Sequence, residues 1–315
     1  MKVGVVGAGA VGAATALSLI ERGGMCREIV LVDRTRERAN GVATDLRYAT
    51  PLSPTVDVRA GDYDSLTDAA LVVITAGVNE KAGGATDRSD PRGRLRLLDT
   101  NAQVYADIVP RVVAVAPQAV LMVVTDPPDP LADLTRRLAG HDRVFSTGTL
   151  IDSLRFRVHL AERLRVRPGD VQALVVGEHG TSEVFLWSSA SVGGIPVLDL
   201  LGQDGQPVDE LRQQIENEIR YANITIIEGT GASQYGIGAV SARLVEAVLR
   251  DERAVLPVAA YSPHHDVTLS LVSVLGAGGV QQMHEPAMTA DERAALERSV
   301  AALREAAGRV LAARS

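Results

Sequence analysis

The chain has 315 residues, of which 46% are apolar and 23% charged, a composition typical of a globular protein. Its formal net charge of −7 gives no general attraction to nucleic acid or to an anionic membrane surface. No apolar run is long enough to span a membrane, and the first residues enter a strand pattern at once, which leaves no room for a signal peptide. The single cysteine, Cys26, cannot form an internal disulfide. We therefore expect a cytoplasmic protein with an inert thiol.

The first half of the chain alternates short β-branched runs with helical patterns. Strands are predicted at 2–6, 29–32, 56–60, 71–75, 119–124 and 143–145. Amphipathic stretches at 11–22 and 95–116 lie between some of them. This alternation predicts a doubly wound parallel sheet with right-handed crossovers.

The pattern changes after about residue 148, which places a domain boundary between 1–147 and 148–315. The features expected beyond it are apolar segments at 171–176 and 185–192, a long helix at 207–228, strands at 255–261 and 267–274, and a terminal helix at 291–313 with Thr289 as its N-cap. These features predict a second, α+β domain.

The first strand is followed directly by a glycine-rich turn, Gly7-x-Gly9-x-x-Gly12, at the start of a helical pattern. The glycines allow a tight turn and close approach to a pyrophosphate, and the helix N-terminus offers free N–H groups. Asp33, at the end of the second strand, can accept the two ribose hydroxyls and would repel a 2′-phosphate. The first domain is thus predicted to be a Rossmann-type domain that binds NAD rather than NADP.

A second group of residues carries acid and base chemistry. Asp152 and Arg155 lie three residues apart on one face of a predicted helix, and His179 follows an apolar segment in VVGEHGTSE. Each residue alone has an ordinary structural interpretation, because helix-start acids and hydrogen-bonded histidines are common. Their joint occurrence is what makes them candidates for a site.

With these motifs the chain resembles the L-lactate/L-malate dehydrogenase family of NAD-dependent 2-hydroxy-acid dehydrogenases. The resemblance runs through nearly the whole chain, in GAGAVG, LVD, ITAGVNEKAGG, RLRLLDTN, VTDP, GTLIDSLRFR, GEHG and GASQYGIG. The combination of LIDSLRFR with GEHG, 27 residues from Asp152 to His179, is highly specific. The resemblance implies hydride transfer between NAD(H) and an L-2-hydroxy acid or 2-oxo acid, a substrate domain after the NAD domain, and a homodimer or homotetramer.

The resemblance also implies a role for each site residue. His179 would be the acid/base, Asp152 would fix its tautomer, and Arg155 would hold the substrate carboxylate. Arg94 would polarise the substrate carbonyl, on closure of a lid at 79–93, and Ser233 would contact the substrate. The residues implied to line the cofactor, besides the three glycines and Asp33, are Val11, Thr75, Ala76, Gly77, Val124 and Thr147.

The lid departs from the family pattern. In the family one residue of a short loop selects the substrate, glutamine in lactate-type and arginine in malate-type enzymes. Counting forward along GVNEKAGG places that residue at Glu80, whereas counting back six residues from Arg94 places it at Arg88. The counts disagree because the loop is about eight residues longer than usual. They predict opposite substrates.

A second departure is Asp126 in VTDPPDP, where the family has an asparagine that donates to the substrate oxygen. An ionised carboxylate has no hydrogen to donate, and it would oppose negative charge developing on that oxygen. Asp126 is therefore protonated, or turned away, or it serves an atypical substrate that is larger than pyruvate or bears a nitrogen group.

Three alternatives remain beside an atypical 2-oxo-acid dehydrogenase. One is a malate dehydrogenase that uses Arg88 or Arg92, another is an imine-reducing enzyme on the same scaffold, and the third is an NAD-binding protein with little catalysis.

Other candidate features receive structural interpretations. We expect no metal site, because His264 and His265 form a loop pair without ligand spacing. His141 and His284 are expected to be exposed, and His159 lies on a helix. The apolar residues of the 207–228 helix serve either the protein's own core or a subunit interface; they are Leu211, Ile215, Ile219 and Ile226.

Overall fold

The structure is a computed structural model that describes the whole chain except residues 53–55, 80, 84–85, 87–92, 203–206 and 313–315, with only the backbone at 93–95 and 312. The strands of its main sheet are β1 (Lys2–Val6), β2 (Glu28–Val32), β3 (Asp57–Ala60), β4 (Ala69–Ile74), β5 (Val120–Val123), β6 (Val144–Ser146), β12 (Ala254–Ser262), β13 (Val267–Gly276) and β14 (Gly279–His284). The helices are α1 (Ala10–Arg22), α2 (Arg36–Arg47), α3 (Gly93–Val115), α4 (Pro128–Ala139), α5 (Leu150–Leu164), α6 (Val197–Leu201), α7 (Val208–Arg220), α8 (Ala222–Thr230), α9 (Tyr235–Leu249) and α10 (Ala290–Ala312).

The first half of the chain forms the predicted doubly wound sheet. Its six strands are parallel and lie in the order β3-β2-β1-β4-β5-β6, with each boundary within two residues of the prediction. The strand order reverses between β1 and β4, and ligands bind at such a point beyond the carboxyl ends of the strands. This edge of the sheet is where the glycine turn and the loop after β5 lie.

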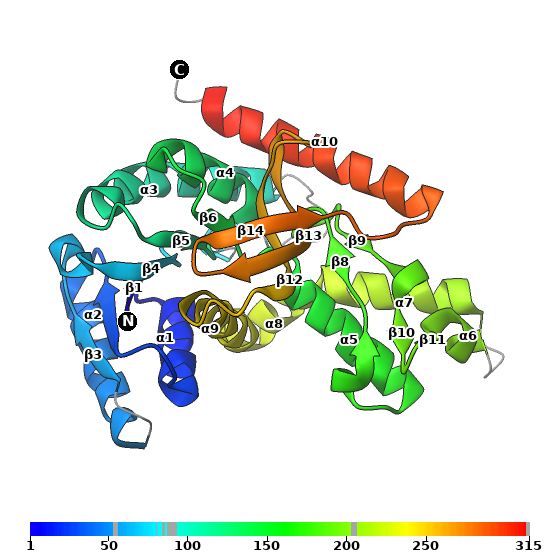
Figure 1. Cartoon of the computed structure of the whole chain (residues 1–315), viewed down its shortest axis with the longest axis horizontal. Helices are drawn as coiled ribbons and strands as arrows, with labels where there is room; N and C mark the ends of the chain where they lie inside the picture. The colour runs from blue at the N-terminus through cyan, green and yellow to red at the C-terminus, as the bar shows by residue number, and fades with distance from the viewer. Residues whose placement is uncertain (53–55, 80, 84–85, 87–92, 203–206, 313–315) are drawn as a thin grey trace.

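Both faces of this sheet are buried under helices (Figure 1). Leu71 and Val73 of β4 face a core that includes residues of α1, α2 and α9. Val72 and Ile74 face a second core with residues of α3, α4 and α10. Strands with helices on both faces are expected to be continuously apolar, as these are. Cys26 lies in the first core, where burial raises the pKa of its thiol to about 11, as expected for an inert thiol.

The long strands of the second half continue the first sheet. β12 pairs antiparallel with β6 through Ala259 and Ser146, and β13 and β14 extend the edge to give nine strands in the described residues. The strands predicted at 255–261 and 267–274 are thus confirmed and somewhat longer. The remaining short strands, which pair in two small sheets, are β7 (Val171–Gln172), β8 (Val175–Val176), β9 (Val184–Phe185), β10 (Ser191–Val192) and β11 (Ile195–Pro196).

Two predictions for the second half need correction. The helix predicted at 207–228 breaks into α7 and α8, because the backbone at Tyr221 leaves the helical region with φ −106° and ψ 8°. The segments 171–176 and 185–192 form separate two-residue strands and turns rather than continuous strands.

Three further predictions concern the helices of the second half and their surfaces. Thr289 caps α10, since its hydroxyl accepts from the Glu292 N–H at 3.2 Å while the Glu292 carboxylate accepts from the Thr289 N–H at 2.9 Å. On α7, Leu211, Ile215 and Ile219 are buried in the protein's own core, so they offer no subunit interface. Ile226 of α8 is exposed, so the alternative of a subunit interface stays open for that residue. In the described part of the chain no helix is long and apolar enough to cross a membrane.

Candidate active site

The glycine turn between β1 and α1 brings backbone segments into close contact. Gly7 has φ +108°, and a side chain there would begin 2.5 Å from the Ala76 nitrogen. A Cβ at Gly12 would lie 1.9 Å from the Gly7 carbonyl oxygen. At Gly9 a Cβ would meet nothing within 4 Å, so the space above the turn is open. Gly7 and Gly12 therefore shape the turn, and Gly9 leaves room for a ligand.

Asp33 ties the end of β2 to this turn. One carboxylate oxygen accepts from the Ala8 N–H at 2.8 Å and the other from the Thr35 N–H at 2.8 Å. A carboxylate has about four lone-pair sites, so Asp33 keeps acceptor capacity for ribose hydroxyls. The expected contact with the ribose remains a prediction.

A hollow leads from the glycine turn to His179. Its outer part is lined by Ala8, Gly9 and Arg38, and its inner part by Arg155 and His179. The two parts share the lining residues Val11, Thr75, Gly77, Asn79 and Ser233. The N-terminus of α1 has no acidic residue in its first turn, so its N–H groups suit an anionic pyrophosphate. These features fit a dinucleotide.

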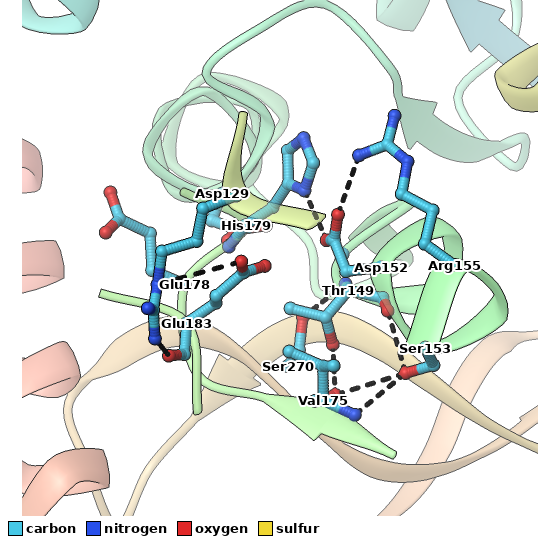
Figure 2. Close-up of polar contacts among 12 residues, drawn as sticks. Asp129, Thr149, Asp152, Ser153, Arg155, Val175, Glu178, His179, Glu183 and Ser270 are labelled. Atoms are coloured by element: carbon cyan, nitrogen blue, oxygen red, sulfur yellow. Dashed lines mark hydrogen bonds and ion pairs between the residues drawn. The ribbon is translucent and has the colours of Figure 1, made fainter. Parts of the chain in front are cut away.

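Asp152 joins His179 and Arg155 at the inner end of the hollow (Figure 2). One carboxylate oxygen lies 2.6 Å from His179 Nδ1, and the other accepts from Arg155 Nη1 at 3.0 Å. The Asp152 side chain is 2% exposed, whereas those of His179 and Arg155 are 18% and 16% exposed. The carboxylate thus lies behind the two groups that line the pocket, and it holds both.

Buried hydroxyl groups bring the start of α5 to the segment that carries His179 (Figure 2). The Thr149 hydroxyl donates to the Val175 carbonyl at 2.5 Å, and Ser153 Oγ accepts from the Val175 N–H at 2.9 Å. Ser270 Oγ accepts from the Thr149 N–H at 3.0 Å. Thr149, Ser153 and Ser270 are fully buried. These hydrogen bonds hold α5 against the segment before His179, so Asp152 and His179 lie close together although 27 residues separate them in the sequence.

Asp129 is a buried residue beside His179 that the sequence analysis missed. It is fully buried, and it accepts from the His179 backbone N–H at 2.8 Å and from the Ser146 hydroxyl at 2.6 Å. Burial raises the pKa of the Asp129 carboxyl to about 6, although both hydrogen bonds lower it. In the sequence Asp129 is the second acid of DPPDP, and it lies in a run of buried residues at the start of α4. An acid within such an apolar run is the signal that could have identified it.

Most of the pocket residues expected from the sequence are brought together. The inner pocket is lined by Val11, Thr75, Gly77, Val124, Asp126, Thr147, Arg155, His179 and Ser233. Ala76 is not among them: its side chain packs against the core, and its carbonyl accepts from the Thr125 hydroxyl at 2.9 Å. The pocket also includes Asn223 of α8, which the sequence analysis missed. The local sequence gives no signal for Asn223, because its pattern predicts one long amphipathic helix at 207–228.

Asn101 supports the pocket wall from α3. Its amide N–H groups donate to the carbonyls of Asp126 at 2.8 Å and Val78 at 3.1 Å, and its oxygen accepts from the Val78 N–H at 2.7 Å. The loops after β4 and β5 are therefore held together by one buried amide. The peptide bond between Asp126 and Pro127 is cis.

The expectations for the lid fall mostly outside the described residues. This applies to Glu80, Arg88 and Arg92, and to the side chain of Arg94, whose backbone lies in the first turn of α3.

Among the histidines, His284 is exposed as expected, but His141 is half-buried.

Family models match both halves of the chain. Residues 1–146 match the lactate/malate dehydrogenase NAD binding domain, and residues 149–313 match the lactate/malate dehydrogenase alpha/beta C-terminal domain. The chain belongs to the lactate/malate dehydrogenase family. It is thus an NAD-dependent oxidoreductase that acts on the CH–OH group of a hydroxy acid.

Individual proteins of this family are similar over nearly the full length. An L-lactate dehydrogenase of Thermus aquaticus is 45% identical, and the alignment covers 98% of each chain. One from Chloroherpeton thalassium is 44% identical over 97% of this chain and 98% of that one. The crystal structure of a minor L-lactate dehydrogenase from Enterococcus mundtii, in a ligand-bound form, has a TM-score of 0.90 at 34% identity, with 98% of each chain covered. These similarities confirm the fold class, the cofactor and the reaction class expected from the sequence.

Proposed function

We propose that His179 is the acid/base of this enzyme and that Asp152 sets its state. The observation that carries this proposal is the 2.6 Å contact between Asp152 and His179 Nδ1. With Nδ1 engaged, proton exchange with the substrate falls to Nε2. When the hydroxy acid is oxidised, neutral His179 takes the hydroxyl proton and Asp152 stabilises the resulting imidazolium. NAD supplies the hydride acceptor when it is bound.

Arg155 is proposed to bind the substrate carboxylate. Its guanidinium keeps further N–H donors beside the one that Asp152 accepts, and it lines the same pocket as His179. The spacing of Asp152 and Arg155, three residues apart on α5, orients both side chains from one rigid element. Val11, Thr75, Gly77, Val124 and Thr147 then form the wall where we place the nicotinamide end of the cofactor.

For the substrate we propose a small monocarboxylic 2-oxo acid, with pyruvate and L-lactate as the reference pair. Among the described residues that line the inner pocket, Arg155 is the one permanent cation, and it matches one carboxylate. A second carboxylate, as in oxaloacetate, would require a further cation, which the described part of the lining does not provide. The relatives that carry the name L-lactate dehydrogenase support the same choice.

Asp126 favours a second candidate, a 2-oxo acid whose side chain carries a hydroxyl or amino group. Asp126 lines the pocket, as do Asn223 and Ser233. In the described part of the chain the side chains of Asn223 and Ser233 make no hydrogen bond, so their polar groups are available to a ligand. An anionic acceptor and two neutral polar groups suit a substrate side chain with N–H or O–H donors.

The test is NADH oxidation with a panel of 2-oxo acids, measured for the natural enzyme and for Asp126→Asn. The panel includes pyruvate, oxaloacetate, hydroxypyruvate and bulky members, each with and without ammonia. If pyruvate has the highest kcat/KM and Asp126→Asn raises it further, the first substrate proposal holds. Preference for hydroxyl- or amino-bearing members that Asp126→Asn abolishes favours the second candidate. Preference for oxaloacetate would favour malate-type selection through Arg88 or Arg92, and a requirement for ammonia would favour imine reduction.

We further propose a boundary at 147/148, a homodimer or homotetramer, and a cytoplasmic location. The boundary is supported by the two family models, because the first match ends at residue 146 and the second begins at residue 149. Light scattering of the purified protein tests the assembly.

A further inference from the structure

The turn between β12 and β13 carries two adjacent histidines that face an acid from another segment. His265 Nε2 lies 3.0 Å from Oε1 of Glu285, and His264 Nε2 lies 3.8 Å from the same oxygen. Glu285 directly follows β14, so 20 residues separate it from His265. The three ligand atoms all lie within 4.8 Å of one another. From this arrangement we propose that His264, His265 and Glu285 bind a divalent transition-metal ion of the zinc class.

The donor set decides the class of ion. Two imidazole nitrogens and one carboxylate suit Zn²⁺, Ni²⁺ or Cu²⁺, whereas Mg²⁺ and Ca²⁺ prefer oxygen ligands. Zinc takes nitrogen and oxygen ligands at about 2.0–2.2 Å, so neighbouring donors around a tetrahedral ion lie roughly 3.3 Å apart. The distances of 3.0 Å and 3.8 Å from Glu285 Oε1 to the imidazole nitrogens bracket this value. The two imidazole nitrogens lie within 4.8 Å of each other, and the exposed side chain of His264 can rotate to bring them to the spacing that an ion requires.

Surrounding groups hold two of the three ligands in place. Arg293 Nη1 donates to the other Glu285 oxygen, Oε2, at 3.1 Å, which leaves Oε1 directed at the imidazoles. The guanidinium of Arg304 on α10 donates to the His265 carbonyl oxygen. Such partners orient metal ligands in established sites. The positive charge of Arg293 opposes a cation, so we expect micromolar rather than nanomolar affinity.

The site is open to solvent on the side of His264. Its side chain is 80% exposed, compared with 15% for His265. An ion can enter from water and keep water at its remaining coordination position. An open fourth position is also what distinguishes catalytic from closed structural zinc sites.

The site lies away from the hydroxy-acid pocket. β12 runs antiparallel to β6, with Ala259 opposite Ser146, so the chain beyond Ala259 moves away from the carboxyl edge of the sheet. The β12–β13 turn instead lies against α10, as the Arg304 contact shows (Figure 1). Metal binding would thus clamp this turn to the segment that leads into α10. It should raise stability by mass action without changing turnover.

The test is a titration of the full-length protein with zinc chloride, followed by calorimetry and by thermal unfolding. We expect one ion per chain and a rise in Tm with zinc concentration. His264→Ala should weaken binding at least tenfold, and because His264 is exposed this variant should fold normally. Glu285→Gln should weaken it to a similar degree. His284→Ala removes a neighbouring exposed imidazole and should bind zinc like the natural protein.

Two results would overturn the proposal. One is the absence of zinc binding up to millimolar concentration. The other is equal zinc affinity in the natural protein, His264→Ala and Glu285→Gln, which would place the ion elsewhere, for example at His179. Neither readout uses enzyme activity, so the outcome is independent of the proposed substrate.

Discussion

The two walls of the inner pocket are built differently. On the wall that carries His179, the supporting groups Thr149, Asp152 and Ser153 are buried. Thr149 and Ser153 share hydrogen bonds with the Val175 backbone, and Asp152 binds both His179 and Arg155. On the second wall, which α8 and the loop before α9 contribute, Asn223 and Ser233 are half-buried and make no side-chain hydrogen bonds within the described part of the chain. We infer that the first wall fixes the reaction and the second selects the substrate. Changes on the first wall should therefore cost turnover, and changes on the second should alter preference.

The largest effect is expected for His179→Gln. Glutamine cannot exchange a proton at neutral pH, so the general acid/base contribution is lost, which is about 10²- to 10⁴-fold in kcat. NADH affinity, followed by fluorescence, should change little. A variant that retains more than a tenth of the natural kcat would remove His179 from the acid/base role.

Arg155→Lys should have a smaller effect than His179→Gln. Lysine keeps the charge but lacks the planar fork that reaches both Asp152 and a carboxylate, so kcat/KM should fall roughly 10- to 100-fold. The loss should be similar for every 2-oxo acid, because all share the carboxylate. A loss confined to some members of a substrate panel would instead assign Arg155 to side-chain selection.

Asp129→Asn tests the buried support of the His179 backbone. The folded-state pKa of about 6 lies above the usual value of 3.8, so between these values the folded protein binds more protons than the unfolded one. The contribution of Asp129 to stability therefore falls as pH rises from about 4 to about 6, by on the order of 3 kcal/mol.

Asparagine does not titrate and removes this dependence. Urea unfolding of both proteins at pH 5 and at pH 7.5 measures the difference. The advantage of the natural protein over Asp129→Asn should be greater at pH 5. An advantage that is greater at pH 7.5 would contradict the raised pKa.

The smallest effect is expected on the selecting wall, for Asn223→Ala. Removal of one neutral amide should change the ratio of kcat/KM between two 2-oxo acids by about tenfold or less. Ser270→Ala, in the buried network, is the matched comparison and should change all substrates alike. If Asn223→Ala also changed all substrates alike, the division between the two walls would be wrong.

Regular patterns made most of the fold predictable. Alternation of apolar strands and amphipathic helices identified the parallel sheet because each element repeats its pattern over many residues. The break at Tyr221 was missed, because no glycine or proline marks it and the apolar spacing continues into α8. The sequence also did not predict that β12 pairs with β6 and extends the first sheet, because this pairing joins segments far apart in the sequence.

The site was predictable where residues fall in short motifs. The glycine turn, LIDSLRFR and GEHG identified the residues that the structure brings together around the pocket. Asp129 and Asn223 were not identified, because their significance lies in contacts made across the fold. The same holds for the proposed metal site, because Glu285 meets the two histidines only in the folded chain.

Asp152→Asn tests the central claim most directly, because Asp152 joins His179 to Arg155 on the first wall. An amide preserves the shape but cannot stabilise the imidazolium. The measurement is kcat over a pH range together with NADH affinity. We predict a fall of about 10²-fold or more in kcat with nearly unchanged NADH affinity. A kcat within about threefold of the natural enzyme across that range would contradict the account.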